Sequence, residues 1–524
     1  MSADSPSAVS ADSPSAVSVV GGAGDDPHPS LHNDDLAPLP AAQRRWGWFK
    51  IFNVWTNDVQ SLAGYTLAAS LFITAGINGW WVFAAIVLAG LFVNWLVNLT
   101  GTPSVRYGIP YAVMARASMG VRGATFPALI RGIVAIFWYG AQTYFASTAV
   151  ALAINAVLGG PDGPPLLLGM TGVDWVSYLI VAVIQILLFV RGIAWIEKFL
   201  NVAGPAVYVV MVALLVAIWV QAGDELLPAV SGIFSSADVQ GWAVVTAFLG
   251  VVGTMVAYFS AVIINFGDFS RFSRTERGMK VGNFTGLPLS LAFFTFLSLF
   301  ITAGAYVVYQ DGQGDPLTNP ADIVGQVGDT ALTVVAALTF LVATIGINLV
   351  ANFIPPAYDL SNLAPQRISF RRGGYLTALF GFVIGALWVA VIDQIGLPKF
   401  VDTLGAVLAP LYGILVADYY LVQRRALLVA DLYSMDPAGR YHYVDGWNVR
   451  AIGAFAVAAV FSVATVWVPW LAELSGFAWV IGAVIGAVLY VAVMRVGTPS
   501  GGPAVPVSPA PADASPADAG STAG

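Results

Sequence analysis

The sequence predicts an all-α polytopic membrane protein with twelve transmembrane helices, and three observations carry this prediction. The 524 residues are 58% hydrophobic and 10% charged, with a mean hydropathy of +0.78, a composition that a water-soluble globule does not have. Apolar stretches long enough to cross a bilayer follow one another along the chain. Basic residues gather on one side of the membrane that these stretches define.

The spanning segments are separated by short polar loops. Residues 1–45 lack a basic start followed by an apolar core, so we expect no signal peptide and expect the first helix to act as the insertion signal. The tails are rich in Ser, Ala, Pro and Asp, which predicts disorder at both ends of the chain. We expect the spans at residues 50–77, 80–102, 124–156, 174–191, 194–221, 242–266, 283–309, 329–354, 372–391, 398–422, 448–470 and 476–495.

The distribution of positive charge sets the expected orientation. With twelve spans, Lys399 is the one basic residue of 22 that falls in a loop on the opposite side. Cytoplasmic loops carry the excess of Lys and Arg. We therefore expect a multi-pass protein of the plasma (inner) membrane with both termini in the cytoplasm.

Composition also narrows the chemistry. The chain has no cysteine, and its three histidines lie in tail or loop regions, so neither thiolate chemistry nor a histidine relay within the membrane is expected. We find no paired carboxylates, metal-ligand spacing or nucleophile with a base, which argues against an enzyme, a metal site or a cofactor. The net charge of −7 indicates no nucleic-acid partner. Nothing resembles the repeated filter of a channel.

Two pairs of residues stand out within the apolar segments. Trp138 and Gln142 are four apart in the third segment, and Asn348 and Asn352 are four apart in the eighth, so each pair shares one helix face. A side-chain amide at this depth must face protein, a cavity or a ligand. A ring beside a group that both donates and accepts suits a flat, polar heterocycle. The alternative is that these residues only join helices.

Two segments that are five helices apart look interrupted. The first carries the polar run 57–64, and the sixth carries Gly250 and Gly253 ahead of Tyr258. Such clusters at matching places in two halves indicate a transporter site built from broken helices. The alternative is that the glycines only permit close helix packing.

Several blocks of sequence resemble one family of membrane proteins. They are GIPYAVMARASMGVRGATFPALIRGIVAIFWYGAQTYF (108–145), VIINFGDFSRFSR (262–274), GINLVANFIPPAYDLSN (346–362), LAPLYGILVADYYLVQRRALLVADLY (408–433) and YHYVDGWN (441–448). Together they resemble the nucleobase–cation symporter-1 family, over roughly residues 46–495. That family includes carriers of hydantoin, cytosine, allantoin, uracil and purines.

The resemblance implies a leucine-transporter-type fold, in which helices 1–5 and 6–10 form two inverted repeats with helices 1 and 6 broken. Helices 11 and 12 would be peripheral. The expected divisions are an N-terminal cytoplasmic tail, the first repeat, the second repeat, helices 11–12 and a C-terminal cytoplasmic tail, at residues 1–45, 46–222, 223–422, 423–496 and 497–524.

The resemblance also implies a substrate site. In the structurally known hydantoin carrier of the family, two aromatic rings sandwich the substrate, and they match Trp138 and Phe259, the second being tryptophan in that carrier. Amides from helices 3 and 8 match Gln142 and Asn352. A carboxamide donates and accepts, as the edge of uracil, hydantoin or allantoin requires. Further expected contacts are Ser61, where the hydantoin carrier has glutamine, with Gln60, Tyr258 and Asn348.

The coupling ion is expected to be a cation, either H⁺ or Na⁺. The hydantoin carrier holds sodium with helix 1 carbonyls, which match the region of Asn57 and Gln60, and with helix 8 groups that include two hydroxyls. Here Gly346 and Ile347 replace those hydroxyls, and Ala343 offers only its carbonyl. A hard cation needs an oxygen cage, so the resemblance argues against a copy of that sodium site.

Asp58 is the alternative coupling residue. It lies beside the expected break of helix 1, and ionisable groups at such depth are usually functional. We therefore favour proton coupling through Asp58. The alternative is a structural role, in which Asp58 caps the broken helix or pairs with an arginine at the membrane interface.

The predicted function is import of a nucleobase or related planar heterocycle by cation symport through alternating access. Uracil, cytosine, allantoin and hydantoin are the expected class. The alternatives are a carrier for purines or thiamine and a membrane sensor that binds such a ligand without moving it. The sequence does not predict the oligomeric state.

Overall fold

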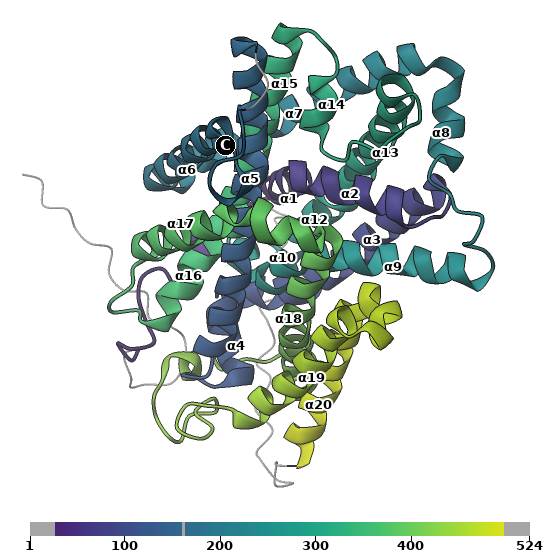
Figure 1. Ribbon diagram of the computed structural model, residues 1–524. Helices are drawn as coiled ribbons and strands as arrows, with labels where there is room; N and C mark the ends of the chain where they lie inside the picture. The colour runs from purple at the N-terminus through teal and green to yellow at the C-terminus, as the bar shows by residue number, and fades with distance from the viewer. Residues whose placement is uncertain (1–26, 160–162, 497–524) are drawn as a thin grey trace, which may run out of the picture.

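The structure is a computed structural model that describes residues 27–159 and 163–496. These residues form a bundle of long helices, several of them interrupted or bent (Figure 1). The predictions of disorder for residues 1–26 and 497–524 lie outside the described residues.

The long elements are α-helices, and short π-helical or 3₁₀ segments join some of them. The α-helices are α1 (Trp48–Val59), α2 (Leu62–Thr74), α3 (Gly79–Tyr107), α4 (Tyr111–Met119), α5 (Thr125–Leu158), α6 (Gly172–Arg191), α7 (Ile193–Ala222), α8 (Leu226–Gly232), α9 (Trp242–Tyr258), α10 (Ser260–Asn265), α11 (Gly267–Ser270), α12 (Glu276–Gly286), α13 (Pro288–Gln310), α14 (Pro320–Gly325), α15 (Thr330–Ile347), α16 (Ile354–Leu363), α17 (Phe370–Ala386), α18 (Leu397–Ala417), α19 (Val449–Trp467) and α20 (Ala478–Val496). The short segments used below are η4 (Asn348–Phe353), η5 (Trp388–Ile392), η6 (Asp393–Ile395) and η9 (Pro469–Phe477).

Helices occupy all twelve predicted segments, which identifies a multi-pass membrane protein. Among the described residues, nine helices are long and apolar enough to cross a membrane, and the pair α17 and Trp388–Ile395, bent by 53°, makes a tenth. The two predicted segments outside this set are the first and the sixth, where the apolar helices α2 and α9 are shorter. These are the segments predicted to be interrupted. The exact number of membrane crossings stays a prediction.

The first interruption is a fully extended pair of residues. Gln60 (φ −89°, ψ 90°) and Ser61 (φ −143°, ψ 159°) separate α1 from α2. The Ser61 hydroxyl accepts a hydrogen bond from the backbone N–H of Gly64 at 2.8 Å, and the Leu62 N–H donates to Thr344 Oγ1 at 3.2 Å. Two of the free N–H groups at the start of α2 thereby gain side-chain acceptors.

The second interruption is a sharp kink. Helix α9 ends at Tyr258, Phe259 has φ −84° and ψ 1°, and α10 continues from Ser260. Gly253 is not at the kink. A Cβ at that position would overlap the carbonyl oxygen of Gly476 in η9, so this glycine permits close packing, as the alternative interpretation of the pattern proposed.

The eighth segment contains a π-helical turn, η4, between α15 and α16. Pro355 and Pro356 follow it, and because proline has no N–H, the Ala351 carbonyl lacks both its i+4 and its i+5 donor. Arg131 Nη2 on α5 donates to that carbonyl at 3.1 Å. The same guanidinium forms an ion pair with Asp359 on α16 through Nη1 and Oδ2 at 3.5 Å, with both side chains fully buried. A buried charge thus joins α5 to η4 and α16.

Part of the predicted N-terminal tail is packed on the helices, so the prediction of disorder over residues 1–45 is wrong for residues 27–45. Leu36 is fully buried and Leu31 nearly so. Asn33 Nδ2 donates to Ser361 Oγ at 2.9 Å, and the Tyr433 hydroxyl donates to the Leu36 carbonyl at 2.6 Å. The polar composition of residues 27–45 did not predict this packing, because two buried leucines are enough to anchor the segment.

Replacing Arg131 tests the buried ion pair. We expect Arg131→Met to destabilise the protein by about 3–5 kcal/mol, because Asp359 is then a buried, unpaired charge. Thermal melting of the purified protein in detergent measures the loss. The double variant Arg131→Met/Asp359→Leu removes both charges and is expected to recover part of the melting temperature, because the Ala351 carbonyl still lacks its donor. A double variant as unstable as the single one would contradict this role for the pair.

Candidate functional site

The middle of α5 faces both interrupted helices and the π-helical turn, and the predicted substrate-binding residues come from these elements. All eight are buried, with exposed fractions of 8% or less. Trp138 and Gln142 lie on α5, and Gln60 and Ser61 lie at the first interruption. Tyr258 and Phe259 lie at the second interruption, and Asn348 and Asn352 lie in η4.

Ser61 joins three of these elements through its hydroxyl. Gln142 Nε2 donates to Ser61 Oγ at 3.4 Å, and the Tyr258 hydroxyl lies 3.2 Å from the same oxygen. The backbone is extended at Ser61, the N-cap of α2. The Ser61 side chain therefore turns back over the start of that helix. The first interruption, α5 and the end of α9 therefore meet at one small polar cluster.

Aromatic rings surround this cluster. Trp138 and Tyr258 meet edge to face with ring centroids 5.3 Å apart, and Tyr258 meets Phe259 at 5.0 Å. Phe400 of α18 contacts the Trp138 ring at 5.3 Å. Tyr258 thus touches both rings that are expected to sandwich a substrate.

The two asparagines of η4 have different surroundings. Asn348 Nδ2 lies within hydrogen-bond distance of the Tyr139 carbonyl (3.1 Å), Thr143 Oγ1 (3.2 Å) and Gln185 Oε1 (2.6 Å). Its Oδ1 accepts from Asn352 Nδ2 at 3.1 Å. Both ends of the Asn348 amide are therefore occupied by protein groups. This arrangement favours Asn348 as the residue that positions Asn352, and not as a direct contact.

Several buried polar atoms of the site have no hydrogen-bond partner in the part of the chain that the structure describes. They are Gln142 Oε1, Trp138 Nε1 and both amide atoms of Gln60. Buried polar groups in folded proteins are nearly always paired with protein, water or ligand. Two of these atoms, the acceptor Gln142 Oε1 and the donor Trp138 Nε1, lie one turn apart on α5.

The predicted ion-coupling residues lie at the end of α1. Asn57 and Asp58 are buried, and Asn57 Nδ2 donates to the Asn53 carbonyl at 2.8 Å. Among the described residues, no basic side chain forms an ion pair with Asp58. Its carboxyl group lies close enough to Tyr258 for the two to interact electrostatically. Asp58 lies two residues before Gln60, where α1 is interrupted.

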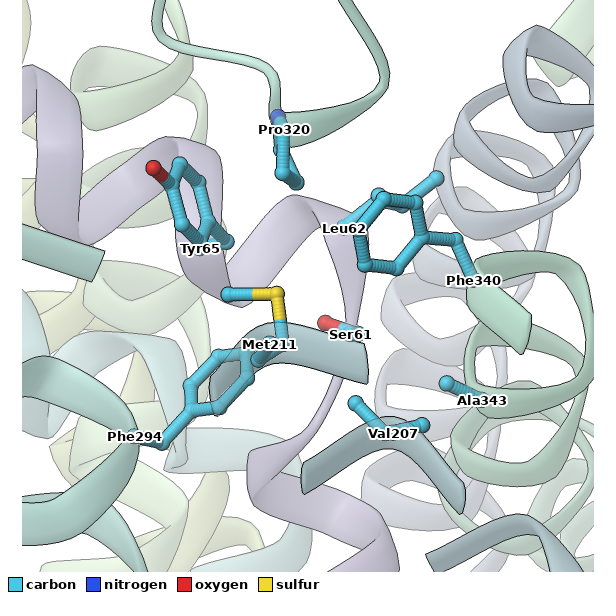
Figure 2. A pocket seen from close by; sticks show the side chains of 9 residues that line it. All are labelled: Ser61, Leu62, Tyr65, Val207, Met211, Phe294, Pro320, Phe340 and Ala343. Carbon is cyan, nitrogen blue, oxygen red and sulfur yellow. The ribbon is translucent and has the colours of Figure 1, made fainter. Parts of the chain in front are cut away.

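Ala343, the third predicted coupling residue, lines a small cavity beside the first interruption (Figure 2). The cavity measures about 10 Å³ for the centre of a water-sized sphere, which is close to the minimum for a single water molecule. Its walls are apolar side chains apart from Ser61 and Tyr65, and the lining residues are Ser61, Leu62, Tyr65, Val207, Met211, Phe294, Pro320, Phe340 and Ala343. The neighbouring Thr344 hydroxyl is occupied by the Leu62 N–H.

Sequence reasoning missed three residues that shape this site. Thr344 holds the start of α2, Gln185 holds Asn348, and Phe400 packs on Trp138. Gln185 carried a usable signal, because it is an amide in the middle of a predicted span. Thr344 and Phe400 carried none, since hydroxyl and aromatic side chains are common in membrane helices.

Helices interrupted near a buried polar cluster, in a multi-pass membrane protein, define the class of broken-helix membrane transporters. Residues 38–488 match the family described as permease for cytosine/purines, uracil, thiamine and allantoin. The chain belongs to this family, the nucleobase–cation symporter-1 family, whose members are transporters and not enzymes.

Two curated relatives show the range of the family. The chain is 32% identical over 477 residues to the allantoin permease of Bacillus subtilis, covering 90% of this chain and 94% of the relative. It is 30% identical over 436 residues to the purine-uracil permease of Arabidopsis thaliana, covering 82% of this chain and 71% of the relative.

Solved structures establish the fold. The closed, bromovinylhydantoin-bound structure of Mhp1, a nucleobase-cation-symport-1 transporter, matches with a TM-score of 0.72 at 23% identity, covering 89% of this chain and 96% of that chain. Its inward-facing structure matches with a TM-score of 0.71 at 22% identity, over 89% and 95% of the two chains. The predicted leucine-transporter-type helical fold is therefore confirmed.

Replacing the two amides separately tests their different surroundings. We expect Asn348→Ala to lower thermal stability by about 1–3 kcal/mol, because it leaves buried groups of Gln185 and Asn352 without a partner. Gln142→Ala should leave the melting temperature nearly unchanged and weaken ligand binding. Melting curves of both variants, with and without allantoin, measure this. A destabilised Gln142→Ala variant beside an unaffected Asn348→Ala variant would reverse the two roles.

Proposed function

We propose that this protein is a secondary active transporter that imports a planar heterocycle of the uracil, cytosine, allantoin or hydantoin class by cation symport. It works in the plasma (inner) membrane with both termini in the cytoplasm. Residues 46–222 and 223–422 form the two inverted repeats, and 423–496 the two peripheral helices. Alternating access comes from movement of the repeats about the site between them.

One observation carries the proposal: Gln142 Oε1 and Trp138 Nε1 are buried without a partner where α5 meets both interrupted helices. A heterocyclic ring with an N–H satisfies Gln142 Oε1. It also stacks on aromatic faces for roughly 1 kcal/mol per contact.

The amides supply the selectivity. A ring that leaves a buried amide group unpaired loses about 1–3 kcal/mol, which discriminates between rings by roughly tenfold to a hundredfold. The similarity to the Bacillus subtilis allantoin permease supports a ureide as the first candidate. Ser61 has a shorter side chain than the glutamine expected there from the hydantoin carrier, so its edge contact to the ring differs. We favour a flat ureide, hydantoin or pyrimidine ring over purines or thiamine.

A proton is the favoured coupling ion. The expected sodium neighbourhood contains Ala343 in an apolar wall and Thr344, whose hydroxyl is occupied by the Leu62 N–H. Helix 8 therefore supplies few free oxygens for a hard cation. Asp58 is buried next to the first interruption with no basic partner in the described residues. A lone carboxyl group within the membrane is suited to bind and release a proton.

Uptake into cells or proteoliposomes tests the function. The panel is radiolabelled allantoin, uracil, cytosine, hydantoin and hypoxanthine, with and without sodium and across pH. We expect one of the first four to be accumulated, faster at low external pH and without a sodium requirement. The Asp58 proposal would be refuted by uptake that sodium stimulates and that neither pH nor a protonophore changes. Counterflow separates a carrier from a sensor, because only a carrier exchanges labelled for unlabelled substrate.

Substitutions locate the site. Trp138→Ala and Asn352→Ala are each expected to lower uptake at least tenfold with normal membrane insertion, since each removes a contact to the ring. The matched control is Trp470→Ala, because Trp470 is 80% exposed and lies outside the site. Normal uptake by Trp138→Ala or Asn352→Ala would exclude that residue from the site.

A further inference from the structure

The buried carboxyl groups of the helices differ in how well their charge is compensated. Five aspartates have exposed fractions of 6% or less: Asp58, Asp268, Asp359, Asp402 and Asp418. Three of them have strong partners. Asp359 pairs with Arg131 at 3.5 Å, Asp268 accepts from the Tyr111 N–H at 2.8 Å and Asn265 Nδ2 at 3.1 Å, and Asp418 accepts from the Tyr490 hydroxyl at 2.7 Å and Gln423 Nε2 at 3.1 Å.

Asp402 on α18 has the least compensation of any aspartate outside the proposed coupling site. Its single partner among the described residues is the neutral hydroxyl of Thr254 on α9, which donates to Oδ2 at 3.3 Å. A buried carboxylate needs a cation or several donors to stay ionised. Asp402 has neither, so the packing seen here suits its neutral, protonated form.

The charged and titratable groups around Asp402 do not supply what is missing. Lys399, one turn earlier on α18, lies over the Trp467 ring at 4.2 Å. Asp393 in η6 and Glu473 in η9 are exposed at the surface. Tyr258, one turn further along α9, bonds to Ser61. Within the described residues, Thr254 is thus the one side chain that forms a hydrogen bond with the carboxyl group.

The position of Asp402 connects it with the substrate site. One turn further along both helices, α18 and α9 touch so closely that a Cβ at Gly405 would lie 2.6 Å from the Ala257 Cβ. Tyr258 follows Ala257 directly, and Phe400, two residues before Asp402, packs on Trp138. The carboxyl group therefore lies between α18 and α9, close in sequence to the Phe400 and Tyr258 rings that pack on Trp138.

We propose that Asp402 is a proton-binding residue whose protonation accompanies the close packing of α18 on α9. When the two helices separate, water reaches the carboxyl group and it ionises. When they close, it takes up one proton from that water and becomes a neutral acid that accepts from Thr254. This inference rests on the proposed function, because α9 and α18 each carry a ring, Tyr258 and Phe400, that packs on Trp138 of the proposed site.

The proposal fixes the direction of the pH dependence. If closure binds one proton, each unit of rising pH above the titration of Asp402 disfavours the closed form by up to about tenfold. The affinity for a substrate that is bound in the closed form then falls with rising pH. Thermal stability in the absence of substrate falls in the same direction, because unfolding releases the proton.

Melting temperature without ligand and allantoin affinity, both measured from about pH 5 to pH 8, test the proposal in the full-length protein in detergent. Asp402→Asn mimics the protonated acid, so we expect it to remove the share of the decline in both quantities that one titrating proton supplies, while the share due to Asp58 remains. The control is Asp393→Asn, an exposed carboxylate in the preceding turn, which should keep the wild-type profile. A wild-type slope in Asp402→Asn, or no pH dependence in the wild type, would overturn the proposal.

A second pair of variants keeps the test decisive if Asp402→Asn folds poorly. Thr254→Val removes the donor to the carboxylate, so proton binding should strengthen and the midpoint of the pH profile should move to higher pH. Thr254→Ser keeps the donor and should keep the wild-type midpoint. Equal midpoints for the two variants would contradict the proposal. Failure of allantoin and the other heterocycles to bind would count against the proposed function alone, because the ligand-free melting profile still reports on Asp402.

Discussion

The structure depends on one constraint: backbone groups that lose their helical partners inside a membrane must find others. Each interruption near the site has a specific solution. Ser61 and Thr344 accept the free N–H groups at the start of α2. Arg131 donates to the Ala351 carbonyl that Pro355 and Pro356 leave without a donor. These bonds hold the backbone of the interrupted segments in place, and with it the side chains of the site.

The same constraint makes unpaired polar atoms informative. Backbone groups at the first interruption and at η4 have side-chain partners, and hydrogen bonds of Asn348 link η4 to α5 and α6. Against that background, Gln142 Oε1 and Trp138 Nε1 remain unpaired. Their position beside Tyr258 and Ser61, where elements distant in sequence meet, is what a ligand site requires. The family to which the chain belongs supplies the class of ligand.

The sequence predicted a large part of this architecture. Hydropathy located the long apolar helices, and the polar run at 57–64 marked the first interruption, because such residues in a span need a special backbone. Trp138 and Gln142 were recognisable because an amide at mid-membrane must have a partner. The blocks of family sequence added Phe259, which no periodicity would have singled out. That these residues contact a substrate stays a prediction.

Other features could not be predicted because they depend on contacts between distant residues. The π-helical turn η4 arises where two prolines follow a helix that Arg131 supports from α5. The roles of Asn348 and Thr344 follow from their partners on other helices. Residues 27–45 pack on Ser361 and Tyr433, more than 300 residues away along the chain. Asp402 was visible as an acid inside a predicted span, yet only the structure shows its one neutral partner.

The most direct test of the account is an experimental structure of the protein with a transported heterocycle bound. We expect the ring between Trp138 and Phe259, within hydrogen-bond distance of Gln142, with the Tyr258 ring moved out of the space that it fills here. A ligand bound elsewhere, with Gln142 Oε1 and Trp138 Nε1 still unpaired, would contradict the account.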